Sequence, residues 1–75
     1  MTLGQRISLY RKKLNISQEE LGARLGVSRQ AVSKWESGRS DPSTTNLIAL
    51  AKLFGIEPEE LLRAAEVKDE SETEG

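Results

Sequence analysis

The sequence contains no cysteine and no histidine. Without cysteine the chain forms neither a disulfide nor a thiolate metal site. Without histidine it lacks the commonest general base and the commonest zinc ligand. Eight of the twelve carboxylates lie in residues 56–75 and form no clustered acid–base site. We therefore expect a protein that is not an enzyme and that holds no metal and no other cofactor.

Long apolar segments are also absent. The longest uninterrupted apolar run, residues 47–51, is far shorter than the roughly 20 residues that a membrane-spanning helix needs. The N-terminal segment is basic and amphipathic, without the apolar stretch and cleavage site of a signal peptide. We expect a cytoplasmic protein with no membrane partner. With 75 residues, the chain is long enough for one domain, whose single core is of marginal size.

The net charge of −1 hides an uneven distribution. Residues 1–55 carry nine basic and four acidic side chains, a net +5, whereas residues 56–75 carry two basic and eight acidic ones, a net −6. A basic body with an acidic end suits a polyanion as the partner of the body. A charge of +5 is modest, however, and an ordinary charged surface explains it equally well.

Apolar residues recur at helical spacing along most of the chain and predict an all-α fold. A first helix is expected over about residues 2–14. The next three are each preceded by a serine N-cap and ended by a glycine, and are expected between Ser17 and Gly26, between Ser28 and Gly38, and between Ser43 and Gly55.

A fifth helix is expected to begin at Pro58, because proline lacks an N–H that the first helical turn does not need. Leu61 and Leu62 are expected to face the core from it. Residues 1–66 then form one helical domain. Residues 67–75, which contain no apolar residue after Val67, are expected to be a disordered acidic C-terminal tail.

The most informative element is the pair of short helices joined by residues 26–28. Gly26 is placed where the turn needs a positive φ. Ser17 and Glu20 have the spacing of a capping box at the start of the first of these helices. Gly22 lies mid-helix, where glycine costs about 1 kcal/mol relative to alanine. We expect this small residue to let the following helix cross closely.

The second helix of the pair has two faces. Val32 and Trp35 are expected to hold it to the core. The opposite face consists of side chains that form hydrogen bonds, and none of them is acidic, whereas an ordinary polar face usually includes Glu or Asp. Arginine and lysine suit guanine, and glutamine suits adenine. This face is predicted to read DNA bases, through Arg29, Gln30, Ser33 and Lys34.

The chain resembles the Xre/Cro/phage-repressor type of helix-turn-helix proteins over about residues 3–66. The most specific part of the resemblance is the pattern W-E-x-G-x-x-x-P at residues 35–42. The other matching stretches are Ser17-Gln18-Glu19-Glu20-Leu21-Gly22, Gly26-Val27-Ser28, Val32-Ser33-Lys34, Leu50-Ala51 and Phe54-Gly55-Ile56. The resemblance implies a compact five-helix bundle of the lambda-repressor-like type, and a sequence-specific transcriptional regulator of double-stranded DNA, most simply a repressor.

The resemblance also implies roles for individual residues. The third helix enters the major groove, where Ser28 joins the base-reading residues. Gln18, at the start of the second helix, contacts a phosphate and braces the first recognition residue, beside the free N–H groups of the helix N-terminus. Further backbone contacts are implied for Arg39, Ser40, Thr44, Thr45 and Asn46. For the last three of these, a capping role is an equal explanation.

Glu36 is the one acidic residue on the predicted recognition helix. An unpaired carboxylate close to phosphates would repel them. Arg11 lies on the first helix between the expected core positions Ile7 and Leu14, and the resemblance implies a partly buried arginine–glutamate pair. We therefore expect a structural ion pair between Arg11 and Glu36.

The expected partner is double-stranded DNA, as a palindromic operator with half-sites about 10 base pairs apart that binds a homodimer. Leu62, Ala65 and Val67 supply a small apolar patch for the dimer, unless the core uses Leu62. Two alternatives remain. The acidic end of the chain allows an antitoxin or adaptor with a protein partner on the same fold. An enzyme is the other, although the sequence offers no clustered catalytic site.

Overall fold

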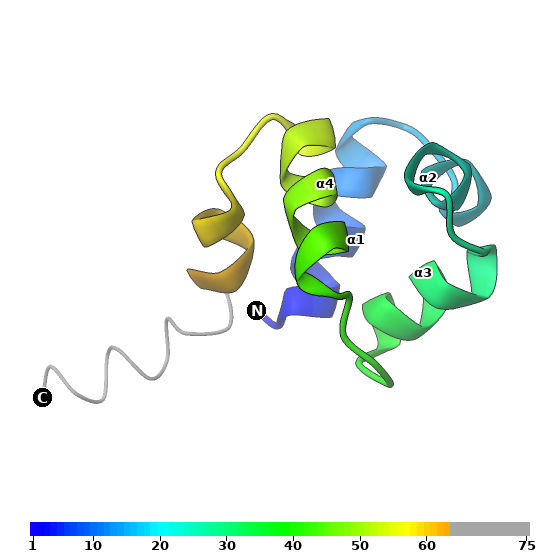
Figure 1. The fold of residues 1–75 in the computed structure, drawn as a ribbon, viewed down its shortest axis with the longest axis horizontal. Helices are drawn as coiled ribbons and strands as arrows, with labels where there is room; N and C mark the ends of the chain where they lie inside the picture. Colours follow the sequence, from blue (N-terminus) through cyan, green and yellow to red (C-terminus); the bar gives the residue numbers. More distant parts are fainter. Residues whose placement is uncertain (64–75) are drawn as a thin grey trace, which may run out of the picture.

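The computed structural model describes residues 1–63, and this part of the chain is helical, without a strand (Figure 1). The helices are α1 (Leu3–Lys13), α2 (Gln18–Leu25), α3 (Arg29–Ser37) and α4 (Thr44–Phe54). Residues 58–63 form a further helical segment that begins at Pro58. The all-α fold with five helices is therefore confirmed. The expected tail, residues 67–75, lies outside the described residues, as do Ala65 and Val67 of the expected dimer patch.

Side-chain hydroxyls cap the start of every labelled helix. Ser17, Ser28 and Ser43 each accept a hydrogen bond from the backbone N–H three residues on, as expected. The expected capping box at α2 is only half formed, because the Glu20 carboxylate accepts from the Arg24 guanidinium instead. A charged donor four residues on competes well with a neutral backbone N–H. A complete capping box does form at α1, between Thr2 and Gln5, and was not predicted.

The core receives one large, fully buried side chain from each of the five helical segments. These side chains are Ile7, Leu21, Val32, Leu50 and Leu61. The expectation that Leu61 and Leu62 both face inward is wrong, because Leu62 is 41% exposed. Adjacent helical positions differ by about 100° around the axis, so two neighbours seldom point into the same core.

Helices α1 and α2 each contact both α3 and α4. Residues 58–63 lie on the side of α4 away from α3 (Figure 1). In the described part of the chain, none of the helices has both the length and the apolar character needed to cross a bilayer.

Glycine allows two close approaches between these elements. A β-carbon on Gly4 would overlap the carbonyl oxygen of Trp35, so α1 and α3 meet backbone to backbone. A β-carbon on Gly22 would lie 2.6 Å from the carbonyl oxygen of Val27 and 3.1 Å from that of Ser28. The close approach predicted at Gly22 therefore exists. It is made by Val27 of the turn and by Ser28, the N-cap residue that opens the following helix α3.

Candidate nucleic-acid interface

Helix α3 is anchored by one face and exposes the other. Val32 and Trp35 are buried in the core. The exposed residues of the helix are Arg29, Gln30, Lys34 and Ser37, and none is acidic. Ser33 is half-buried beside them. The structure thus brings the four residues predicted to read bases onto the part of α3 that is turned away from the core.

Ser28 combines two roles at the start of this helix. Its side chain is exposed, and its hydroxyl oxygen accepts a hydrogen bond from the N–H of Ala31 at 3.1 Å. The hydroxyl hydrogen stays available for another acceptor, because a serine hydroxyl both donates and accepts. Ser28 therefore caps α3 and still presents a donor next to Arg29.

The turn between α2 and α3 holds the two helices in a fixed relation. Gly26 has a φ of 78°, and the N–H of Val27 donates to the carbonyl of Gly22 at 2.8 Å. This is the usual way for a helix to end on a left-handed glycine. Val27 packs against the core. The backbone of the turn lies against Gly22, where a side chain would overlap it. This close contact fixes the direction in which α3 follows α2.

Arg11 and Glu36 form a partly buried ion pair. The Nε of Arg11 donates to Oε2 of Glu36 at 2.7 Å, and Nη2 donates to Oε1 at 3.2 Å. The two side chains are only 12% and 9% exposed. The Nη1 of Arg11 also donates to the carbonyl oxygen of Ile16 at 2.8 Å. The pair thus ties α3 to α1 and to the loop before α2, and both charges are satisfied.

Gln18 is connected differently from the expectation. Its Nε2 donates to Oε1 of Glu36, in the last turn of α3, at 2.9 Å. No bond from Gln18 to the first recognition residue is among the hydrogen bonds of the described residues; the amide nitrogen donates instead to the ionised carboxylate of Glu36, a stronger acceptor than a neutral group. Sequence reasoning missed this link because residues 18 positions apart are brought together only by the packing of α2 against α3.

The predicted backbone-contacting residues lie in the loop after α3 and in the first turn of α4. The backbone N–H groups of Arg39 and Ser40 both donate to the carbonyl of Lys34, which holds the start of the loop against α3. Both side chains are exposed. Thr44 and Thr45 are exposed and Asn46 is half-buried. The capping role considered for these three belongs to Ser43, whose hydroxyl accepts from the N–H of Asn46.

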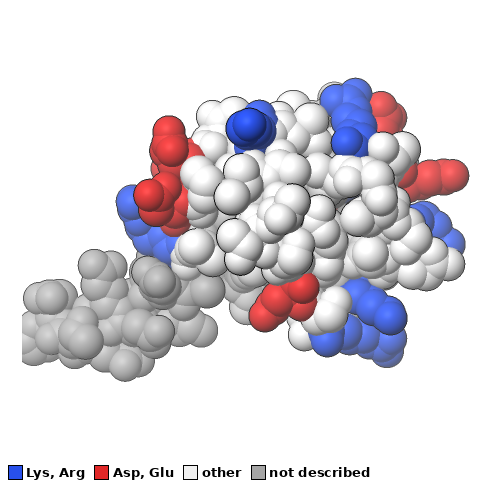
Figure 2. All heavy atoms as spheres, in the orientation of Figure 1, with Lys and Arg blue, Asp and Glu red and all other residues white. Residues whose placement is uncertain are grey.

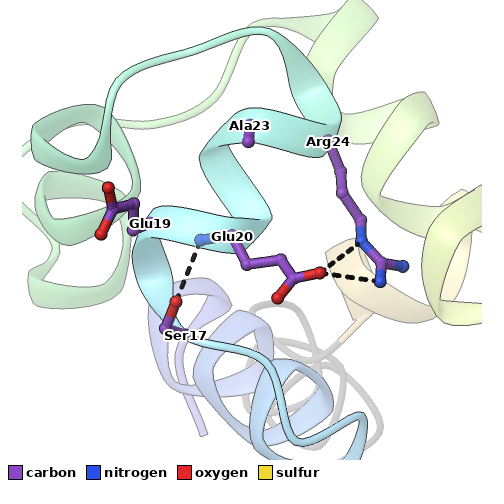
Figure 3. A pocket seen from close by; sticks show the side chains of 5 residues that line it. All are labelled: Ser17, Glu19, Glu20, Ala23 and Arg24. Atoms are coloured by element: carbon purple, nitrogen blue, oxygen red, sulfur yellow. Dashed lines mark hydrogen bonds and ion pairs between the residues drawn. The ribbon is translucent and has the colours of Figure 1, made fainter.

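The surface charge differs between the edge formed by α3 and the outer side of α2. Figure 2 shows basic side chains at the edge that α3 and the following loop form in Figure 1, with an acidic side chain beside them. A hollow of about 460 Å³ on the outer side of α2 has a different character (Figure 3). Glu19 and Glu20 line it, and the Glu20–Arg24 ion pair crosses it with both side chains 48% exposed. This acidic hollow suits a polyanion less well than the exposed face of α3, where no side chain is acidic.

A family model described as helix-turn-helix, HTH_3, matches residues 7–61, which is most of the chain. The chain belongs to this helix-turn-helix family. The matched residues include all of α2, α3 and α4 and the turn between α2 and α3.

Individual relatives are similar at the level of both sequence and structure. Repressor protein C2 of Salmonella phage P22 is 44% identical over 61 residues, which cover 81% of this chain and 28% of that protein. The HTH-type transcriptional activator BcrR of Enterococcus faecalis is 38% identical over 74 residues, which cover 99% of this chain and 36% of that protein. The chain therefore spans only about a third of the length of these two relatives.

A solved structure matches the fold over almost its whole length. The crystal structure of the P22 c2 repressor in complex with a synthetic operator superposes with a TM-score of 0.78 at 43% sequence identity. The match covers 81% of this chain and 92% of that chain. The arrangement of α2, the turn and α3 described above is thus similar to that of a repressor bound to its operator.

Proposed function

We propose that the protein is a transcriptional regulator that acts in the cytoplasm and binds double-stranded DNA in a sequence-specific way, with α3 in the major groove. One observation carries the proposal. The exposed side chains of α3 are all able to form hydrogen bonds and none is acidic, while Val32 and Trp35 hold the other side of the helix to the core. A helix presented in this way fits the major groove, whose base edges offer donors and acceptors.

The proposed base-reading residues are Ser28, Arg29, Gln30, Ser33 and Lys34. The proposed phosphate contacts are Gln18, Arg39, Ser40, Thr44, Thr45 and Asn46, which flank α3 at the start of α2 and in the loop that follows. The similarity to a repressor–operator complex supports DNA as the partner of this surface. We propose repression as the mode of action, because a domain that occupies a promoter blocks it without any further contact.

We propose that two copies bind one palindromic site. A single copy presents five base-reading residues, whereas specific protein–DNA interfaces bury roughly 1,000–2,500 Å² of protein surface. Pairing two copies on half-sites about 10 base pairs apart doubles the contacts. Leu62 is 41% exposed, next to the buried Leu61. Pairing of two copies would cover this apolar side chain. The proposed DNA-binding domain comprises residues 1–66.

The test is a selection of bound duplexes from random DNA, carried out at two salt concentrations. The expected result is a shared palindrome together with affinity that falls steeply as salt rises, because bound basic residues displace counterions from the phosphates. Equal binding to all sequences would contradict sequence-specific regulation and favour an adaptor with a protein partner.

A matched pair of variants separates the interface from general charge. Lys34→Ala and Lys52→Ala each remove one exposed lysine from the last turn of a helix. Lys34 belongs to the exposed face of α3, whereas Lys52 lies at the end of α4 that points away from the loop after α3 (Figure 1). Only Lys34→Ala is expected to weaken binding to the selected duplex. An equal loss in both variants would assign binding to net charge instead of α3.

A further inference from the structure

The carboxylate of Glu36 lies at the centre of a hydrogen-bond network that joins four segments. Its Oε2 accepts from Nε of Arg11, and its Oε1 accepts both from Nη2 of Arg11 and from Nε2 of Gln18. Arg11 in turn donates to the carbonyl of Ile16. The network therefore connects α1, the loop before α2, the first residue of α2 and the last turn of α3.

The position of this carboxylate is unusual for a DNA-binding surface. Glu36 lies on the same helix as the exposed basic residues Arg29 and Lys34, where a negative charge opposes phosphate binding. Among the ion pairs of the described residues, Glu36 takes part in one, with Arg11. Arg11 neutralises Glu36, but the pair then adds no net attraction for DNA. An effect of Glu36 on DNA binding must therefore come from the atoms that it holds.

Apart from Arg11, Glu36 binds the side-chain amide of Gln18. Gln18 is the first residue of α2 and is half-buried. A primary amide nitrogen carries two hydrogens, and the bond to Glu36 uses one of them. Among the described residues no acceptor lies within hydrogen-bond distance of the second N–H, which can donate to a ligand. A long glutamine side chain at a helix start otherwise samples several rotamers, and fixing it in advance lowers the entropy lost on binding.

We infer that Glu36 is a positioning residue for DNA binding: held by Arg11, it fixes the Gln18 amide so that its second N–H meets a DNA phosphate. The inference rests on the proposed function and specifies how one of its phosphate contacts is made. Glu36 itself touches no phosphate. Its contribution to affinity passes through Gln18, in spite of its own negative charge.

The test compares four proteins on the duplex recovered by the selection: wild type, Gln18→Ala, Glu36→Gln, and the double variant. Gln18→Ala is expected to weaken binding about tenfold, because a hydrogen bond to a charged phosphate is lost. Glu36→Gln leaves a single acceptor oxygen for three donors, so the Gln18 amide is released. It is expected to weaken binding severalfold although it removes a negative charge.

The decisive measurement is the effect of Glu36→Gln in the Gln18→Ala background. With no amide left to position, only the removal of negative charge remains, so the substitution is expected to raise affinity and to steepen the salt dependence. A loss of the same size in both backgrounds would mean that Glu36 acts only through the fold. A gain in both backgrounds would mean that it acts only through its charge. Either result overturns the inference.

A second measurement does not depend on how Glu36→Gln folds. Uncharged methylphosphonates are placed one at a time along the selected duplex, and wild type is compared with Gln18→Ala, which leaves the Arg11–Glu36 pair in place. One position is expected to weaken wild type and to leave Gln18→Ala unaffected. If every position affects both proteins equally, Gln18 makes no phosphate contact and the inference fails.

Glu20→Gln is the matched control, because it removes a carboxylate from α2 that pairs with Arg24 outside the network. It is expected to cause no loss of affinity. Failure of wild type to select any duplex would contradict the proposed function itself. Normal selection by wild type, with no special dependence of Glu36 on Gln18, would contradict only this inference.

Discussion

Gly4 lies so close to the carbonyl oxygen of Trp35 that no β-carbon fits between them. The carbonyl of Glu36 is the next neighbour, 2.8 Å from the same β-carbon position. Helix α1 therefore rests on the backbone of the last part of α3. This contact fixes the distance between α1 and α3 at Glu36, the residue whose carboxylate binds Arg11 and Gln18.

Gly4→Ala is expected to destabilise the protein, although alanine normally stabilises a helix by about 1 kcal/mol relative to glycine. The atoms in the way belong to the backbone and cannot rotate aside, so α1 and α3 must separate. Overpacking of this kind costs about 1–3 kcal/mol. Chemical denaturation measures the change in the free energy of unfolding. Lys12→Ala, at an exposed position of α1, is the control and is expected to change it by less than about 0.5 kcal/mol. Equal stability of the two variants would contradict the close contact.

Local features of this fold could be predicted from the sequence, and contacts between distant segments could not. The serine caps and the left-handed Gly26 depend on a few neighbouring residues, so they are visible in the chain itself. Gly4 carries no such signal, because its neighbour lies 31 positions away in Trp35. The same reason hid the bond between Gln18 and Glu36. Which of two adjacent leucines faces the core, at residues 61 and 62, was likewise decided by packing.

Glu36→Ala is expected to lower the free energy of unfolding by about 3–5 kcal/mol, because it leaves the charged Arg11, only 12% exposed, without its partner. Glu20→Ala is the control. It breaks an ion pair whose side chains are 48% exposed, and exposed pairs contribute about 0–1 kcal/mol. Thermal or chemical denaturation of both variants checks the difference. A loss below about 1 kcal/mol for Glu36→Ala would show that water compensates Arg11.

Gln30→Ala is expected to reduce discrimination at one base step by about 1–3 kcal/mol and to leave the other steps unchanged, because a glutamine amide pairs with a single base edge. Competition between the selected duplex and its single-base variants measures this. Ser37→Ala is the control on the same helix, since its hydroxyl donates to the carbonyl of Lys34. It is expected to keep all preferences. A uniform loss of affinity in Gln30→Ala would assign Gln30 to the DNA backbone.

Arg39→Ala is expected to weaken binding by a similar factor on every duplex, because the side chain lies in the loop after α3 and its proposed partner is a phosphate. The loss of one phosphate contact reduces the slope of log affinity against log salt by about 0.9. Titrations at several salt concentrations measure both effects. Lys52→Ala removes the same charge from the far end of α4 and is expected to leave the slope unchanged (Figure 1). If Arg39→Ala alters the preferred base at one step while the slope stays constant, Arg39 contacts a base edge, and base reading extends beyond α3.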